Sequence, residues 1–207
     1  MATFMTKNYR VADEGSYYVA QNATDGTGIA GHAAPVQADT DTKALLHIFN
    51  GGQSRIYLDY LRLRMTAIGG GASTTDFAIY VDNKGSTAYS SGGTTITPAN
   101  VNRDTDCGTE ATIKFGPVVT VTGFTKIGHQ RVRSVVPVVE DQYVFTFGKP
   151  SQVPVSALST TGTAVCQTIT AFPPIVIVSE GNFNFTQWGT SQSGAHSFEF
   201  ELGYWEL

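Results

Sequence analysis

Short segments in which apolar and polar residues alternate follow one another from Lys43 to the end of this 207-residue chain. They recur about every 8–12 residues with turn signals between them, and no long stretch carries the apolar period of an amphipathic helix. Alternation predicts strands with one buried face. A series of such strands is typical of a β-sandwich or barrel, and all-β chains of about 200 residues commonly form one domain.

The expected strands are segments 44–50, 55–65, 76–82, 111–115, 118–124, 131–139, 142–148, 166–172, 174–178, 183–188 and 196–205. In segment 55–65 the apolar phase shifts, because Tyr60 shares a face with Leu58 whereas Leu61 starts the opposite phase. A β-bulge near Tyr60 would reconcile the two phases. Pro137 within 131–139 indicates an edge strand or a bulge.

Phenylalanines are concentrated in the last two expected strands. In the last strand one face carries His196, Phe198, Phe200 and Leu202, and the other carries Ser197, Glu199 and Glu201. Phe183 and Phe185 give the preceding strand a matching apolar face. The sequence Ser179-Glu180-Gly181-Asn182 predicts a hairpin turn between 174–178 and 183–188, with Gly181 able to adopt a positive φ. We therefore expect a core strand at the C-terminus.

Residues 1–43 differ from the rest, because they are rich in Gly, Ala, Thr and Asp and show no sustained period. A stretch this long without regular structure favours an arm outside the compact domain. We expect an extended N-terminal arm over residues 1–43 and a β-sandwich over residues 44–207. Four spaced residues are the expected anchors of this arm on a partner surface: Tyr9, Tyr17, Tyr18 and Val19. A disordered terminus is the alternative.

A second surface expectation concerns self-association. One predicted sheet face is more apolar than a solvated face should be, since it carries Tyr57, Leu61, Leu63 and Met65. Trp205 also falls on the side opposite Phe198 and Phe200 and is expected to be exposed. Exposed apolar patches mark interaction sites, so these residues predict a homo-oligomer.

Glu199 and Glu201 form the best candidate for a catalytic pair. Alternation places both carboxylates on one sheet face about 7 Å apart, a separation compatible with a glycosidase acid and base. Charges that alternate with a phenylalanine core are, however, the ordinary pattern of a solvent-facing strand. The chain has no Gly-x-Ser-x-Gly motif. We therefore expect no enzymatic activity.

No cofactor or metal site is expected. Asn102, Asp104 and Asp106 alternate like the start of a calcium loop, but Cys107 stands where that loop needs glycine, and the final glutamate is replaced by Ile113. The four histidines are scattered without the spacing of zinc ligands: His32, His47, His129 and His196. Cys107 and Cys166 are expected as separate thiols, with a disulfide as the alternative.

Charge and hydrophobicity limit the partners and the location that we expect for the chain. The formal net charge is −4 with a pI near 5.5, so no basic field is available for nucleic acid. No apolar run reaches the roughly 20 residues that a membrane span needs. The N-terminus has no apolar signal segment, which favours synthesis and retention in a cytoplasm.

The polar N-terminal segment, the stretch "TTITPANVNRDT" before a strand and the ending "SFEFELGYWEL" together resemble small structural proteins of tailed-bacteriophage virions. The similarity is to the jelly-roll proteins that decorate or cement the capsid. It implies a jelly-roll sandwich, a non-enzymatic role on the capsid surface after assembly in the host cytoplasm, the major capsid protein as a partner, and a homotrimer.

Two alternatives belong to other functional classes. A host-receptor or carbohydrate-binding module of a tail fibre or spike would favour exposed aromatic residues on one face or in loops, and Trp188 and Trp205 are the only two tryptophans. A glycan hydrolase would use Glu199 and Glu201. Tail fibres commonly contain repeats or heptads, and the sequence shows neither.

Overall fold

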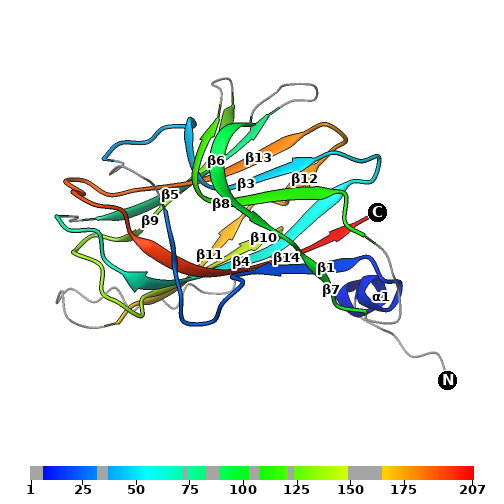
Figure 1. Cartoon of the computed structure of the whole chain (residues 1–207), viewed down its shortest axis with the longest axis horizontal. Coiled ribbons are helices and arrows are strands. Elements are labelled where there is room, and N and C mark those ends of the chain that lie inside the picture. Colours follow the sequence, from blue (N-terminus) through cyan, green and yellow to red (C-terminus); the bar gives the residue numbers. More distant parts are fainter. Residues whose placement is uncertain are drawn as a thin grey trace.

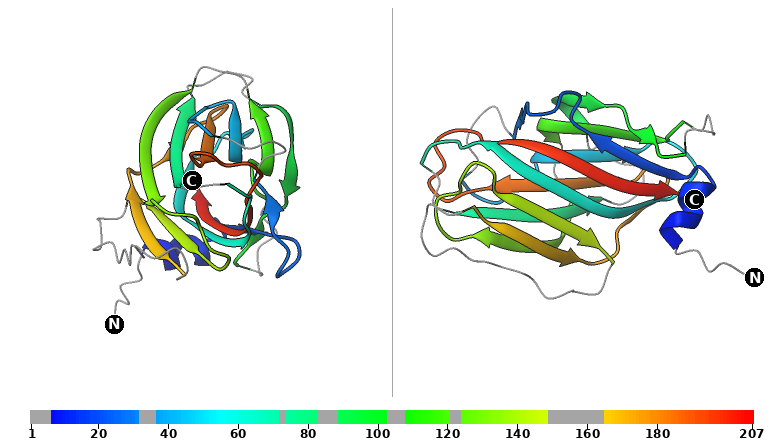
Figure 2. Two further views of the ribbon diagram at one scale, coloured as in Figure 1. Left: turned by 90° about the vertical axis from the view of Figure 1, so that its left-hand side faces the viewer. Right: turned by 90° about the horizontal axis from the view of Figure 1, so that it is seen from below.

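Two β-sheets pack face to face in the computed structural model, which describes residues 7–31, 37–71, 74–82, 89–102, 108–120, 124–148 and 165–207 (Figure 1). One sheet has eight strands and the other six. The prediction of an all-β sandwich is confirmed. A single helix, α1 (Lys7–Asp13), occurs in the described part of the chain, and it lies near the C-terminus at one end of the sandwich (Figures 1 and 2).

The eight-stranded sheet contains β1 (Tyr17–Gln21), β2 (Ile29–Ala30), β4 (Ile56–Ala67), β7 (Ala99–Asn100), β10 (Gln142–Phe147), β11 (Gln167–Phe172), β12 (Val176–Ile177) and β14 (Ser197–Glu206). Its main order is β11-β10-β4-β14-β1-β7, while β12 pairs with β4 and β2 pairs with β14. The six-stranded sheet contains β3 (Lys43–Asn50), β5 (Thr75–Asp82), β6 (Tyr89–Ile96), β8 (Ala111–Thr120), β9 (Thr125–Arg133) and β13 (Asn182–Trp188). Its order is β6-β8-β3-β13-β5-β9. The pairing of β10 with β11 is parallel, and the other strand pairs are antiparallel.

A bulge in β4 explains the phase shift seen in the sequence. Gly203 of β14 lies opposite Tyr60, and the next residue, Tyr204, lies opposite Leu58, so that Asp59 is the extra residue. The extra residue turns Leu61 back to the side of Leu58, and both side chains are buried in the core. The predicted bulge near Tyr60 is confirmed.

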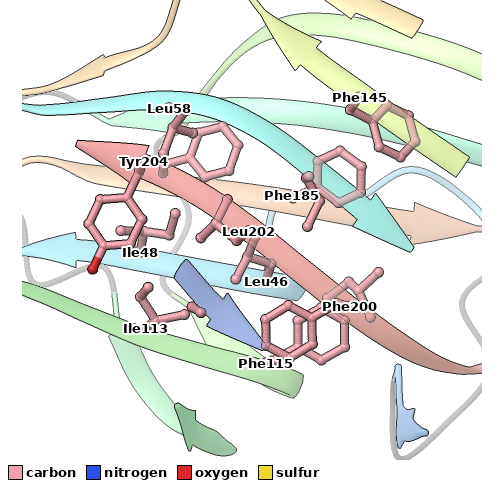
Figure 3. Packing of buried hydrophobic residues seen from close by; sticks show 14 of the residues in the cluster. Leu46, Ile48, Leu58, Ile113, Phe115, Phe145, Phe185, Phe200, Leu202 and Tyr204 are labelled. Atoms are coloured by element: carbon pink, nitrogen blue, oxygen red, sulfur yellow. The ribbon is translucent and has the colours of Figure 1, made fainter. Parts of the chain in front are cut away.

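Aromatic side chains from both sheets fill the space between them (Figure 3). Phe200 of β14 stacks on Phe115 of β8 with ring centroids 4.0 Å apart, and Phe185 of β13 packs edge-on against Phe145 of β10 at 4.9 Å. The expected alternation of β14 is confirmed, because Phe198, Phe200 and Leu202 are buried while the intervening glutamates are half-buried. Burying each of the three apolar side chains contributes about 1.5–3 kcal/mol to the free energy of unfolding.

The predicted hairpin at residues 174–188 is wrong. Strand β12 pairs with β4 in one sheet and β13 lies in the other, so the turn between them carries the chain across the sandwich. The amide of Gly181 donates to the carbonyl of Val178 over 2.8 Å, and Glu180, not Gly181, adopts the positive φ of 60°. A turn signal marks a reversal of the chain but does not say whether the next strand joins the same sheet.

Other differences concern strand limits. Strands β6 and β7 lie in the stretch that the sequence predicts as loop. Strand β6 consists mainly of Ser, Thr and Gly, which show no apolar alternation, and β7 has only the two residues Ala99 and Asn100. Strand β9 ends at Arg133, and Pro137 lies outside the strands.

The N-terminal segment differs from the expected arm over residues 17–21. These residues form β1, which is paired with β14 on one side and with β7 on the other. Tyr18 points into the core and stacks on Tyr204, with ring centroids 5.5 Å apart. Two hydrogen-bonded neighbours and a buried aromatic ring hold this part of the chain in its own sandwich.

The apolar face that predicted self-association is not exposed. Leu61, Leu63 and Met65 are fully buried in the core, because the bulge turns them inward. Tyr57 lies before the bulge and is half-buried on the outer side, where it stacks on Trp205. Trp205 is only 8% exposed, since it packs with Val11 of α1 and with Tyr17. The expectation of an exposed Trp205 is therefore corrected, and this argument for an oligomer no longer holds.

Candidate functional site

A polar hollow of about 330 Å³ lies on the outer face of the eight-stranded sheet. Its floor consists of two arginines of β4, Arg62 and Arg64, and two glutamates of β14, Glu199 and Glu201. The strand register sets this arrangement, because Arg62 lies opposite Glu201 and Arg64 lies opposite Glu199. Figure 2 (right) shows this outer face, with β4 and β14 side by side and α1 at one end.

Ion pairs hold the four charged side chains of the floor in place. The Arg62 guanidinium lies 2.8 Å from Glu201 Oε2, and Arg64 Nε donates to Glu199 Oε2 over 2.7 Å. Arg64 also contacts Glu140 at 3.1 Å. The hydrogen bond that Arg64 donates to Glu199 is the main cause that raises the pKa of Arg64. Cross-strand pairs of opposite charge are the expected way for a sheet to arrange such residues.

The wall of the hollow is the loop that follows β1. The side-chain amide of Asn22 donates to the carbonyl of Thr27 over 2.9 Å, and its oxygen accepts from the amide of Phe200 over 2.7 Å. The amide of Gly26 donates to Glu199 Oε1. The loop is thus attached to the strand that forms the floor.

Tyr60 borders this charged group and depends on a glycine. Its hydroxyl donates to Glu201 Oε1 over 2.7 Å, and burial is the main cause that raises its pKa. A Cβ atom on Gly203, directly opposite, would lie 2.3 Å from Tyr60 Cε1 and 2.5 Å from the Tyr17 hydroxyl. Gly203 therefore provides the space that the Tyr60 ring occupies.

The arrangement limits the chemistry that the two glutamates can perform. Both oxygens of Glu201 accept hydrogen bonds, from Tyr60 and Arg62, and both oxygens of Glu199 do so, from Gly26 and Arg64. Each glutamate thus has one arginine partner and one neutral donor, the Tyr60 hydroxyl for Glu201 and the Gly26 amide for Glu199. Because each carboxylate oxygen can accept a second hydrogen bond, the group can still bind a hydrogen-bonding ligand.

The four expected arm anchors do not form one surface. Tyr18 faces the core, whereas Tyr17 and Val19 face outward and lie in or against the cluster with Trp205. The Tyr17 hydroxyl donates to Asp59 over 2.7 Å. Tyr9 belongs to α1, and its side chain lies outside the described part. That these residues bind a partner stays a prediction.

Of the four residues considered as the start of a calcium loop, only Asn102 lies in the described part of the chain. Asn102 donates to the carbonyl of Asp13, and Asp104, Asp106 and Cys107 lie outside the described residues. Within the described ranges, no three His, Cys, Asp or Glu side chains gather where they could hold a metal ion. Cys166 is buried, and burial raises the pKa of its thiol.

The histidines have separate surroundings. His47 contacts Asn184 Oδ1 at 2.7 Å, and His129 stacks on Trp188 and contacts Asp76 at 3.1 Å. His196 directly precedes β14 and is buried. Its Nδ1 accepts a hydrogen bond from the amide of Gly69, two residues after the end of β4. His32 lies outside the described residues.

Sequence reasoning found Glu199 and Glu201 but missed the other half of the hollow. Arg62 and Arg64 alternate as the glutamates do, which is a signal of a charged outer face. The sequence does not say that β4 and β14 are neighbours, since more than 130 residues separate the partners, for example 139 between Arg62 and Glu201. The role of Asn22 in the loop had no signal beyond its preference for turns.

Comparison with family models, curated proteins and solved structures gives no match to this chain. Among the described residues, no helix is long and apolar enough to span a bilayer.

Proposed function

We propose that the protein is a non-enzymatic structural component of a phage virion, which decorates and stabilises the capsid by binding the major capsid protein. The observation that carries this proposal is the hydrogen bonding of Glu199 and Glu201, the best catalytic candidates in the sequence. Glu199 and Glu201 use all four carboxylate oxygens in bonds to their own sheet and loop. Carboxylates that are bonded within their own sheet and loop in this way are suited to a structural or binding role.

We further propose that the sandwich is a jelly roll. The path of the long strands supports this, because the chain changes sheet from β3 to β4 and again from β4 to β5. It changes sheet in the same way from β9 to β10 and from β13 to β14. Strands that wind alternately through two packed sheets are a feature of jelly rolls.

The virion role is tested by mass spectrometry of purified particles of the phage that encodes the chain, after heads and tails have been separated. We expect the chain in the head fraction at a fixed ratio to the major capsid protein. Recovery with the tails would support the receptor-binding alternative, and absence from both fractions would reject the virion role.

Self-association belongs to the same proposal, and the trimer rests on the resemblance alone. Light scattering should give a mass about three times that of the 22.1 kDa chain. A mass near that of one chain at micromolar concentration would reject the trimer.

A further inference from the structure

We propose that the polar hollow on the outer face of the eight-stranded sheet binds a neutral saccharide of one or two rings. The inference does not depend on the capsid role, because sugar binding and head binding are measured separately. It rests on the shape of the hollow, on its charge balance and on hydrogen-bonding groups that the protein leaves unused.

The hollow has the size of a small-ligand site, and hydrogen bonds connect its floor with its wall. Its volume of about 330 Å³ lies at the lower end of the range for small-ligand sites. The floor is fixed by cross-strand ion pairs, and the wall is fixed by Asn22 and by the bond from Gly26 to Glu199. A preorganised site loses little conformational entropy when a ligand binds.

The charge balance selects the class of ligand. Arg62 pairs with Glu201, Arg64 pairs with both Glu199 and Glu140, and Asp25 also lines the hollow, so that the carboxylates outnumber the two guanidinium groups. An anion would therefore meet carboxylates, and a cation would meet guanidinium groups. A neutral ligand avoids both penalties, and an apolar one would strip water from these charges without replacing their hydrogen bonds.

Unused donors and acceptors match hydroxyl groups. The Arg62 side chain is 55% exposed and makes one hydrogen bond through Nη2, so other N–H groups remain available. The side-chain amides of Gln21 and Gln142 line the hollow and make no hydrogen bond to any described residue. Each carboxylate oxygen can accept a second bond. Vicinal hydroxyls, which both donate and accept, fit such a set.

Affinity should be modest, because the one aromatic residue of the lining, Phe200, has its side chain in the core. Without a ring on which a sugar can stack, we expect a dissociation constant on the order of 1 mM.

The test is a titration of the full-length 15N-labelled protein with lactose, maltose and N,N'-diacetylchitobiose, followed by NMR. We expect saturable shifts of the Gly26 and Gln142 amide signals with at least one of these sugars. Arg62→Ala should weaken this binding about tenfold, as loss of a charge-assisted hydrogen bond would. The matched control is Arg10→Ala, which removes an exposed arginine of a surface ion pair with Glu14 and should leave the affinity unchanged.

Three outcomes would overturn the proposal. The first is the absence of shifts with all three sugars up to about 50 mM, well above the expected dissociation constant. The second is unchanged affinity in Arg62→Ala with its thermal unfolding intact, which would place binding elsewhere. The third is the same set of shifts with inorganic phosphate or calcium chloride, which would identify an ion site.

Discussion

Burial of His196 makes the folded state sensitive to pH. The imidazole is fully buried, and its Nδ1 accepts a hydrogen bond of 2.9 Å from the amide of Gly69. Desolvation lowers the pKa of His196 from 6.5 to about 4. The unfolded chain therefore binds a proton more readily than the folded one, so stability is complete above the unfolded pKa and is lost as pH falls towards the folded pKa.

Replacing His196 should remove this dependence. Between about pH 7 and about pH 4.5, the free energy of unfolding of the wild type should fall by about 2–3 kcal/mol more than that of His196→Asn. Urea denaturation at both pH values measures the difference. His47, whose pKa is also lowered by burial, leaves a dependence of the same sign in the variant. Parallel losses in both proteins would show that His196 does not titrate as described.

Gly203 is required by its neighbours and not by its own backbone angles. Gly203→Ala would force a Cβ atom to within 2.3 Å of the Tyr60 ring. We expect a loss of about 1–3 kcal/mol in the free energy of unfolding, as for other overpacked sites. Gly108→Ala is the control, because a Cβ atom there has no heavy atom within 4 Å, and it should be nearly neutral. Equal effects in the two variants would contradict the packing argument.

Among the elements, β1 decides whether the N-terminal segment belongs to the sandwich or forms a separate arm. Tyr18 is 3% exposed and stacks on Tyr204, whereas Val19 is half-buried on the opposite face. Tyr18→Ala should lower the free energy of unfolding by about 3–5 kcal/mol, as loss of a large core side chain does. Val19→Ala should cost about 1 kcal/mol or less.

Urea denaturation of the two variants decides between a strand and a detachable arm. If residues 1–43 formed an arm, Tyr18→Ala would leave the free domain as stable as the wild type. The paired β1 instead predicts that this substitution, or deletion of residues 1–43, lowers the unfolding temperature. Unchanged stability of both Tyr18→Ala and the deletion variant, in urea and on heating, would support the arm hypothesis.

The sequence predicts strands well where one face is apolar and poorly where it is not. The phenylalanines of β14 and the phase shift of β4 locate a core strand and a bulge from local pattern alone. Strand β6, made largely of Ser, Gly and Thr, has no such pattern, because its side chains are mostly exposed. Sheet membership is a non-local property, which is why the local pattern predicts a hairpin at Ser179–Asn182 although β12 and β13 lie in different sheets.

At the scale of the whole molecule, the polar hollow was half predictable. Alternation places Glu199 and Glu201 on the outer face, and that prediction is confirmed. Their partners come from the pairing of β4 with β14 and from a loop near the N-terminus, and neither neighbour is visible in the local sequence. The same pairing places each glutamate opposite an arginine of β4, in ion pairs that the local sequence does not predict.

Binding to capsids tests the proposed function most directly. Purified full-length protein is mixed with phage heads that lack it, and the heads are sedimented. We predict saturable co-sedimentation, with a fixed number of copies per head and no competition by added sugar. Protein that stays in the supernatant at every concentration, or that pellets without saturation, would contradict a role in capsid decoration.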